Sequence, residues 1–132
     1  MASYLLDTHV FLWMISDKDN LSDKSKRIVE NINNKIYLSV ASLWEISIKY
    51  SINKLVLPEE PEVFILNEVY EEELLLLQIT PIHALRVHAI PQIHKDPFDR
   101  LLITQSITDS IPLISSDETI GSYRKVGLNL VW

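Results

Sequence analysis

Strand-like and helix-like stretches alternate along the whole of this 132-residue chain, and this alternation limits the folds that it can adopt. Short apolar runs predict five strands, at residues 4–8, 36–38, 74–79, 111–115 and 128–132. The intervening segments are long enough to hold helices, which favours parallel strands joined by right-handed crossovers. We therefore expect an α/β fold, a three-layer sandwich around a central parallel sheet of about five strands, with residues 1–132 forming a single domain.

The helix boundaries follow from capping residues. The predicted helices cover residues 10–14, 21–33, 40–50, 61–70, 82–89, 97–108 and 118–123, and residues 17–20 form a polar loop. The helix at 21–33 would direct Ile28, Val29 and Ile32 towards the core. Four residues before these helices suit the N-cap position, because their side chains can accept hydrogen bonds from free N–H groups: Ser22, Ser39, Thr80 and Asp96.

Composition excludes several classes of site. The chain is 47% hydrophobic and 23% charged, which is typical of a globular domain. It has no cysteine, and therefore no disulfide, thiolate metal site or cysteine nucleophile, which fits a reducing cytoplasm. Its only glycines, Gly121 and Gly127, cannot form a glycine-rich phosphate loop. No secretion signal or membrane-spanning run is evident, so we expect a cytoplasmic protein without a membrane partner.

The net charge of −6 is unevenly distributed along the chain. Seven of the eighteen acids lie within residues 59–73, which contain no Lys or Arg. The rest of the chain carries 12 basic residues and 18 − 7 = 11 acidic ones. Binding to nucleic acid normally depends on basic side chains. The charge therefore neither supports nor forbids a polyanionic partner.

Four acids are predicted to meet at one edge of the sheet. Asp7 and Asp117 follow strands, while Glu45 and Asp99 lie in the early turns of helices that begin at the same edge. Ligands of open parallel sheets bind at this edge, where the strands end. Crowded carboxylates raise one another's pKa unless a cation compensates them. Because all the ligand atoms are oxygens, we predict that these four residues bind Mg²⁺ or Mn²⁺.

Such a cation can polarise a phosphodiester, lower the pKa of a bound water and orient in-line displacement. Metal-dependent hydrolysis of a phosphodiester is therefore the reaction class that the acids indicate. In this interpretation Asp7, Glu45, Asp99 and Asp117 are catalytic residues as well as metal ligands.

Four segments resemble the PIN-domain nucleases and, more narrowly, the VapC-type toxins of type II toxin–antitoxin modules. They are residues 4–10 (YLLDTHV), 42–46 (SLWEI), 96–102 (DPFDRLL) and 113–117 (LISSD). The resemblance implies a Mg²⁺- or Mn²⁺-dependent endoribonuclease that acts as a toxin, is often a homodimer and is held inactive by a cognate antitoxin. The four acids match those of the family. The preference for an RNA substrate over DNA comes from this resemblance alone.

Each of the four acids also has a purely structural interpretation. Asp7 can start a turn, Asp117 can cap a short helix, and Asp99 can interact with a helix dipole. Glu45 can pair with Lys49 one helical turn later. Against this, Glu45 shares its helix face with three apolar residues, which favours an inward direction: Ala41, Ile48 and Ile52.

Structural roles are favoured for several neighbouring residues. Asp96 is interpreted as a helix cap, Thr8 and Ser116 as turn-stabilising hydroxyls, and His9 and His94 as local hydrogen-bonding groups. Solvated surface charge is favoured over contact with RNA phosphates for three basic residues: Lys49, Lys95 and Arg100.

Two other functions are open at this stage. The first is a catalytically idle PIN module that acts by binding an antitoxin or RNA, although the intact set of acids argues against it. The second is a phosphoryl-accepting, receiver-like domain. That fold needs a second acid beside the first strand and a lysine after the last one, and neither residues 7–8 nor residues 128–132 supply them.

Overall fold

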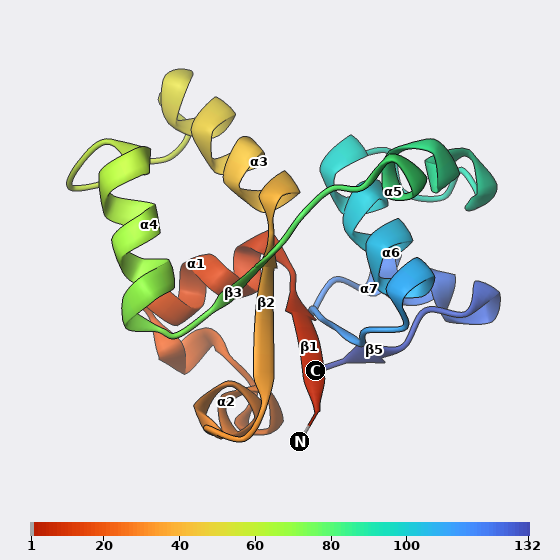
Figure 1. The fold of residues 1–132 in the computed structure, drawn as a ribbon, viewed down its shortest axis with the longest axis horizontal. Helices are drawn as coiled ribbons and strands as arrows, with labels where there is room; N and C mark the ends of the chain where they lie inside the picture. The colour runs from red at the N-terminus through yellow and green to blue at the C-terminus, as the bar shows by residue number, and fades with distance from the viewer. Residues whose placement is uncertain (1) are drawn as a thin grey trace.

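The computed structural model describes residues 2–132, in which helices lie on both sides of one parallel sheet (Figure 1). The first part of the chain forms β1 (Ser3–Leu6), α1 (Thr8–Ser16), the 3₁₀ helix η1 (Lys18–Asn20), α2 (Asp23–Glu30), β2 (Lys35–Ser39), α3 (Val40–Ser51) and α4 (Pro61–Glu71). The second part forms β3 (Leu75–Leu77), α5 (Pro81–Arg86), η2 (Val87–Ala89), α6 (Pro97–Asp109), β4 (Leu113–Ile114), α7 (Glu118–Gly121), η3 (Ser122–Val126) and β5 (Leu130–Val131).

The five strands pair in the order β3-β2-β1-β4-β5, and every pair is parallel. β1 is the central strand, with Leu5 opposite Tyr37 of β2 on one side and Leu113 of β4 on the other. The connections run outwards in one direction from β1 through β2 to β3, and in the other direction through β4 to β5. The boundary between β1 and β4 is therefore the switch point at which sheets of this kind bind ligands.

Alternating side chains on the central strands build two cores, one on each face of the sheet. Leu5 and Leu113 belong to the cluster that includes residues of α6. Leu6 and Ile114, the next residues along each strand, belong to the cluster that includes residues of α1 and α4. Figure 1 shows α1, α2 and α4 on one side and α5, α6 and α7 on the other. The predicted three-layer α/β sandwich is confirmed.

All four predicted N-caps are present. Ser22 accepts from the N–H of Ser25, and Ser39 accepts from the N–H of Ala41, both at 3.0 Å. Thr80 accepts from the N–H of His83, whose ring in turn accepts from the N–H of Thr80. The cap at Asp96 is described with the site.

Some predicted boundaries are wrong. Residues 18–20 form a 3₁₀ helix rather than a loop, and the third, fourth and fifth strands are shorter than expected. α2 ends at Glu30 rather than at residue 33. The Asn34 side chain donates to the Ile28 carbonyl, and Asn31 accepts from the N–H of Asn33, so asparagine side chains form a turn there. Ile32 lies in this turn and is 90% exposed, not part of the core.

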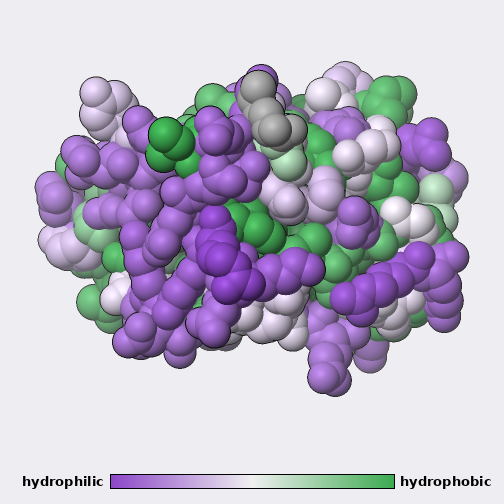
Figure 2. Space-filling model, turned by 90° about the horizontal axis from the view of Figure 1, so that it is seen from below, coloured by the Kyte–Doolittle hydropathy of each residue, from purple (hydrophilic) through white to green (hydrophobic). Residues whose placement is uncertain are grey.

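Polar side chains cover much of the face on which β1 and β2 begin, and apolar ones show between them (Figure 2). Most glutamates of the acidic segment, residues 59–73, are exposed, as expected for a solvated helix surface. Among residues 2–132, none of the helices combines the length and the apolar character that crossing a membrane requires.

Candidate active site

Asp7 directly follows the central strand, and it is buried with 6% of its surface exposed. Its carboxylate caps α1 by accepting from the N–H of His9 at 3.4 Å. Its Oδ2 also accepts from Ser115 Oγ at 2.6 Å. Burial raises the pKa of Asp7, and the hydrogen bonds from Ser115 and His9 offset only part of this effect. The end of the central strand therefore holds a carboxyl group in a place that disfavours its charge.

Glu45 lies in α3 and is 4% exposed, so the predicted inward direction is correct. Of the three apolar residues expected to share its inward face, Ala41 is buried, but Ile48 and Ile52 are 37% and 53% exposed. Lys49 Nζ lies 2.8 Å from Glu45 Oε2, and this hydrogen bond raises the pKa of Lys49. Glu45 Oε1 is buried and has no hydrogen-bond partner. A buried, unpartnered carboxylate oxygen is costly unless a cation or a donor reaches it.

Asp99 occupies the first turn of α6, and its pKa is raised to about 8. Burial is the largest cause, followed by the negative charges of Asp7, Asp96, Glu45 and Asp117. Three acids from distant parts of the chain, Asp7, Glu45 and Asp117, together with the cap residue Asp96, are therefore close enough to Asp99 to disfavour its ionisation. This is the crowding that the sequence predicted for this edge of the sheet. α3 and α6 lie next to each other there, at the upper end of β1 and β2 in Figure 1.

Asp117 follows β4 and caps α7 by accepting from the N–H of Thr119 at 2.8 Å. The ring of His94 lies between Asp117 and Asp99, with Nε2 3.4 Å from Asp117 Oδ2 and 3.1 Å from Asp99 Oδ2. One potential ligand atom from each of these three residues lies within 4.8 Å of the other two. The structure thus brings Asp99 and Asp117 together as predicted, and it adds His94 to them.

Ser115 is a site residue that the sequence analysis missed. It is buried at the end of β4, where its hydroxyl donates to Asp7 and accepts from the N–H of Asp117 at 3.1 Å. Ser116, the neighbouring serine predicted to lie beside the acid, is exposed. Adjacent residues of an extended chain point in opposite directions, so an error of one position exchanges a buried side chain for a solvated one. Ser115 directly follows Ile114, which pairs with Leu6, and this register brings it beside Asp7 but cannot be read from the sequence.

The interpretation of Arg100 as solvated surface charge is wrong. Its guanidinium is buried and donates to Tyr123 Oη at 3.3 Å and to backbone carbonyls of the segment before α6: Val87, Ile90, Pro91 and His94. Five donors on a rigid fork can reach several carbonyls at once. Thr8 does not stabilise a turn as expected, because its buried hydroxyl donates to Ser42 Oγ at 2.8 Å and so joins α1 to α3.

Comparison with protein families agrees with this geometry. The family model described as PIN domain matches residues 4–126. The chain belongs to the PIN-domain family. Proteins of this family are generally nucleases, and the crowded carboxylates of this PIN domain are of a kind that can hold a divalent cation. No curated protein sequence matches the chain significantly.

Solved structures share the fold of this PIN domain at low sequence identity. A chain of the DNA-bound VapBC from Salmonella typhimurium matches with a TM-score of 0.70 and 18% identity, over 99% of this chain and 98% of that one. A chain of VapBC2 from Rickettsia felis, bound to a promoter DNA fragment, gives 0.68 and 14% over 98% and 97%. VapBC-1 from nontypeable Haemophilus influenzae gives 0.66 and 15% over 98% and 96%.

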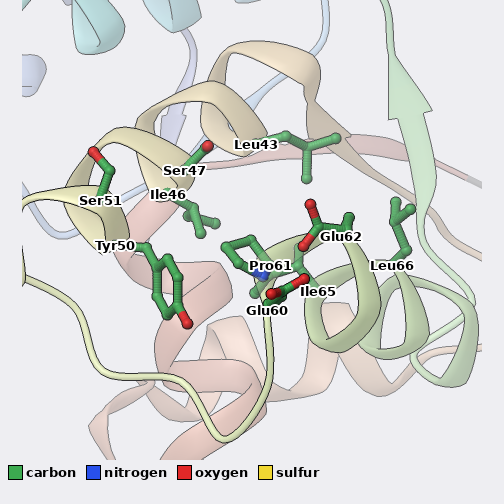
Figure 3. A pocket seen from close by; sticks show the side chains of 10 residues that line it. All are labelled: Leu43, Ile46, Ser47, Tyr50, Ser51, Glu60, Pro61, Glu62, Ile65 and Leu66. Atoms are coloured by element: carbon green, nitrogen blue, oxygen red, sulfur yellow. The ribbon is translucent and has the colours of Figure 1, made fainter.

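A pocket of about 550 Å³ lies away from the acids, between α3 and α4 (Figure 3). Its lining includes Leu43 and Ile46 from α3 and Ile65 and Leu66 from α4, and none of the four predicted site acids contributes to it. This pocket is therefore distinct from the carboxylate cluster of this PIN domain.

Asp96 is confirmed as a helix cap, since its Oδ1 accepts from the N–H groups of Phe98 at 2.8 Å and Asp99 at 3.1 Å. Replacing it with Ala should lower the free energy of unfolding by about 1 kcal/mol, because those two N–H groups lose their acceptor. Asp96→Ser should keep most of this stability, since serine also caps helices. Urea denaturation of both variants measures the difference, and equal losses in the two would contradict the capping role.

Proposed function

We propose that this PIN domain is a metal-dependent endoribonuclease that acts as the toxin of a type II toxin–antitoxin module. In this proposal Asp7, Glu45, Asp99 and Asp117 are the catalytic acids, and they bind Mg²⁺ or Mn²⁺. The observation that carries it is the crowding around Asp99, whose carboxylate lies with that of Asp117 in a group of ligand atoms within 4.8 Å of one another. In keeping with this crowding, burial and the charges of the other acids raise the pKa of Asp99 to about 8. Such a group of carboxylates is electrostatically unfavourable alone and becomes favourable around a divalent cation.

A bound cation would polarise the phosphodiester and favour ionisation of an attacking water. The contribution of the chain is to fix the carboxylates in advance. Ser115 holds Asp7, Lys49 holds one oxygen of Glu45 and leaves the other without a partner, and the Thr119 N–H holds Asp117. Asp99 belongs to the first turn of a 13-residue helix, where the helix dipole favours a negative charge.

A cognate antitoxin is the proposed protein partner. The support is that the solved structures with the same fold are described as VapBC complexes, and that they match over nearly the whole length of both chains. The family resemblance also leads us to propose an RNA substrate and a homodimer. Lys49 is already paired with Glu45, so Lys95 is the nearby lysine that we propose to contact RNA phosphates.

The proposed activity can be tested by incubating the purified protein with end-labelled RNA and Mn²⁺ or Mg²⁺. We expect endonucleolytic cleavage with either cation. EDTA should abolish this cleavage, and Mn²⁺ in excess over EDTA should restore it. A DNA oligonucleotide of the same sequence should remain intact. Cleavage that persists in EDTA would contradict the metal mechanism, provided that an Asp7→Asn preparation purified in the same way is inactive and so excludes contamination.

A further inference from the structure

His94 joins two acids that come from different elements. It lies in the segment between η2 and α6, and its side chain is 14% exposed. Its Nε2 is 3.1 Å from Oδ2 of Asp99, which belongs to α6, and 3.4 Å from Oδ2 of Asp117, which follows β4. One ring nitrogen therefore bridges two carboxylates that are 18 residues apart in the chain.

The contact of the other ring nitrogen, Nδ1, determines whether Nε2 of His94 carries a proton. Nδ1 of His94 accepts a hydrogen bond from the N–H of Asp96 at 3.1 Å. An accepting Nδ1 carries no proton, so in a neutral imidazole the proton is on Nε2. The Nε2–H group then donates to Asp117 Oδ2, and Asp99 Oδ2 lies 3.1 Å from the same nitrogen. A protonated nitrogen has no lone pair for a metal ion, so in this arrangement His94 contacts both acids without being a metal ligand.

Two buried side chains hold the backbone of His94 in place. Its N–H donates to Tyr123 Oη at 2.8 Å, and its carbonyl accepts from Arg100 Nη1 at 3.4 Å. Both side chains also donate to the carbonyl of Pro91, each at 2.8 Å. Tyr123 is completely buried and Arg100 is 6% exposed. The segment that carries His94 is therefore attached to the protein interior by a charged hydrogen-bond network, which explains why Arg100 is buried.

We propose that His94 is a positioning residue for the metal site. Its neutral Nε2–H group fixes the two carboxylates through a hydrogen bond to Asp117 and close contact with Asp99, and Arg100 and Tyr123 fix the backbone that carries the ring. The inference rests on the proposed function in that it requires a divalent cation to bind these carboxylates. Hydrogen bonds from groups behind metal ligands orient the ligands and commonly change metal affinity by about 10- to 100-fold.

Two variants separate the donor from the rest of the side chain. In His94→Asn, the amide oxygen can replace Nδ1 as acceptor for the Asp96 N–H, but nothing reaches the carboxylates. In His94→Gln, the amide nitrogen lies where Nε2 lies and can still donate. Titration calorimetry with Mn²⁺ should show binding to His94→Asn that is about 10-fold weaker or more, and binding to His94→Gln within about 3-fold of wild type. Circular dichroism checks that both variants are folded.

Two spectroscopic readouts test the role independently of activity. In the metal-free protein, ¹⁵N NMR of the imidazole should show the proton of His94 on Nε2. In the Mn²⁺-loaded protein, electron spin-echo modulation should show no directly coordinated imidazole nitrogen. A coordinated nitrogen that disappears in His94→Gln would overturn the inference in favour of a ligand role, and equal weakening in both variants would reduce it to a structural role.

Failure of the inference is distinguishable from failure of the proposed function. Wild-type Mn²⁺ affinity in His94→Asn would overturn the positioning role alone. A wild-type protein that binds no Mn²⁺ would overturn the proposed metal-dependent function, and the positioning role with it.

Discussion

The Asp99→Asn variant should cleave RNA at least about 100-fold more slowly than the wild type, a loss of about 2.7 kcal/mol of transition-state stabilisation. Asp99 is the acid on which the charges of Asp7, Asp96, Glu45 and Asp117 all act, so it occupies the centre of the cluster. An amide in its place removes a negative ligand without changing the size of the side chain. Single-turnover cleavage of labelled RNA at saturating Mn²⁺ measures the effect.

The same substitution should stabilise the metal-free protein at neutral pH, because it removes a carboxyl group whose charge is disfavoured by burial. Thermal unfolding in EDTA should therefore show a higher midpoint for Asp99→Asn than for the wild type. Loss of activity together with a gain in stability is typical of a residue that is retained for function. A general folding defect would lower both quantities.

Asp23→Asn provides a matched control. Asp23 also lies in the first turn of a helix, α2, but it is exposed and belongs to a different part of the surface. This variant should cleave RNA at the wild-type rate and change the free energy of unfolding by less than about 0.5 kcal/mol. Equal rates for Asp99→Asn and Asp23→Asn would contradict the role proposed for Asp99.

The sequence was sufficient for the features that depend on local chemistry. Ser39 and Asp96 were identifiable as caps because an acceptor side chain before a helix satisfies free N–H groups wherever the helix lies. The five parallel strands followed from short apolar runs separated by helix-length segments. The strand ends were less accurate, since pairing with neighbours decides how far a ladder extends. The exposed Ile32 shows that apolar character alone does not place a residue in the core.

The site was predictable as a group of acids but not as a network. Asp7 and Asp117 could be placed at the edge of the sheet because strand ends define that edge. Ser115, which connects the two, depends on the register between β1 and β4 across 108 positions of sequence. His94 and Arg100 depend on the path of an irregular segment, which has no periodicity to read. The positions of the acidic residues could therefore be predicted from the sequence, whereas the hydrogen bonds that orient their carboxylates are visible only in the structure.

The affinity for Mn²⁺ should fall as the pH is lowered below about 8, by up to about tenfold per pH unit. The pKa of Asp99 in the metal-free protein is raised to about 8, first by burial and then by the neighbouring carboxylates, so the cation must displace a proton at neutral pH. Calorimetry at pH 7 in buffers of different ionisation enthalpy should show the release of about one proton per bound ion from this group. Asp99→Asn should abolish this release, apart from any contribution of Asp7, whose pKa is also raised.

The ionisation of Asp99 should also affect the stability of the metal-free protein. The free energy of unfolding should fall as the pH rises, whereas the affinity for Mn²⁺ should rise. The unfolded chain loses the Asp99 proton near pH 3.8, whereas the folded chain keeps it up to about pH 8. Between these values the folded state binds more protons, so the free energy of unfolding falls as the pH rises, with a limiting slope of about 1.4 kcal/mol per pH unit. Urea denaturation in EDTA should therefore show that the free energy of unfolding depends less on pH in Asp99→Asn than in the wild type. Parallel pH profiles for the two proteins would show that Asp99 ionises normally and that the carboxylates are not crowded.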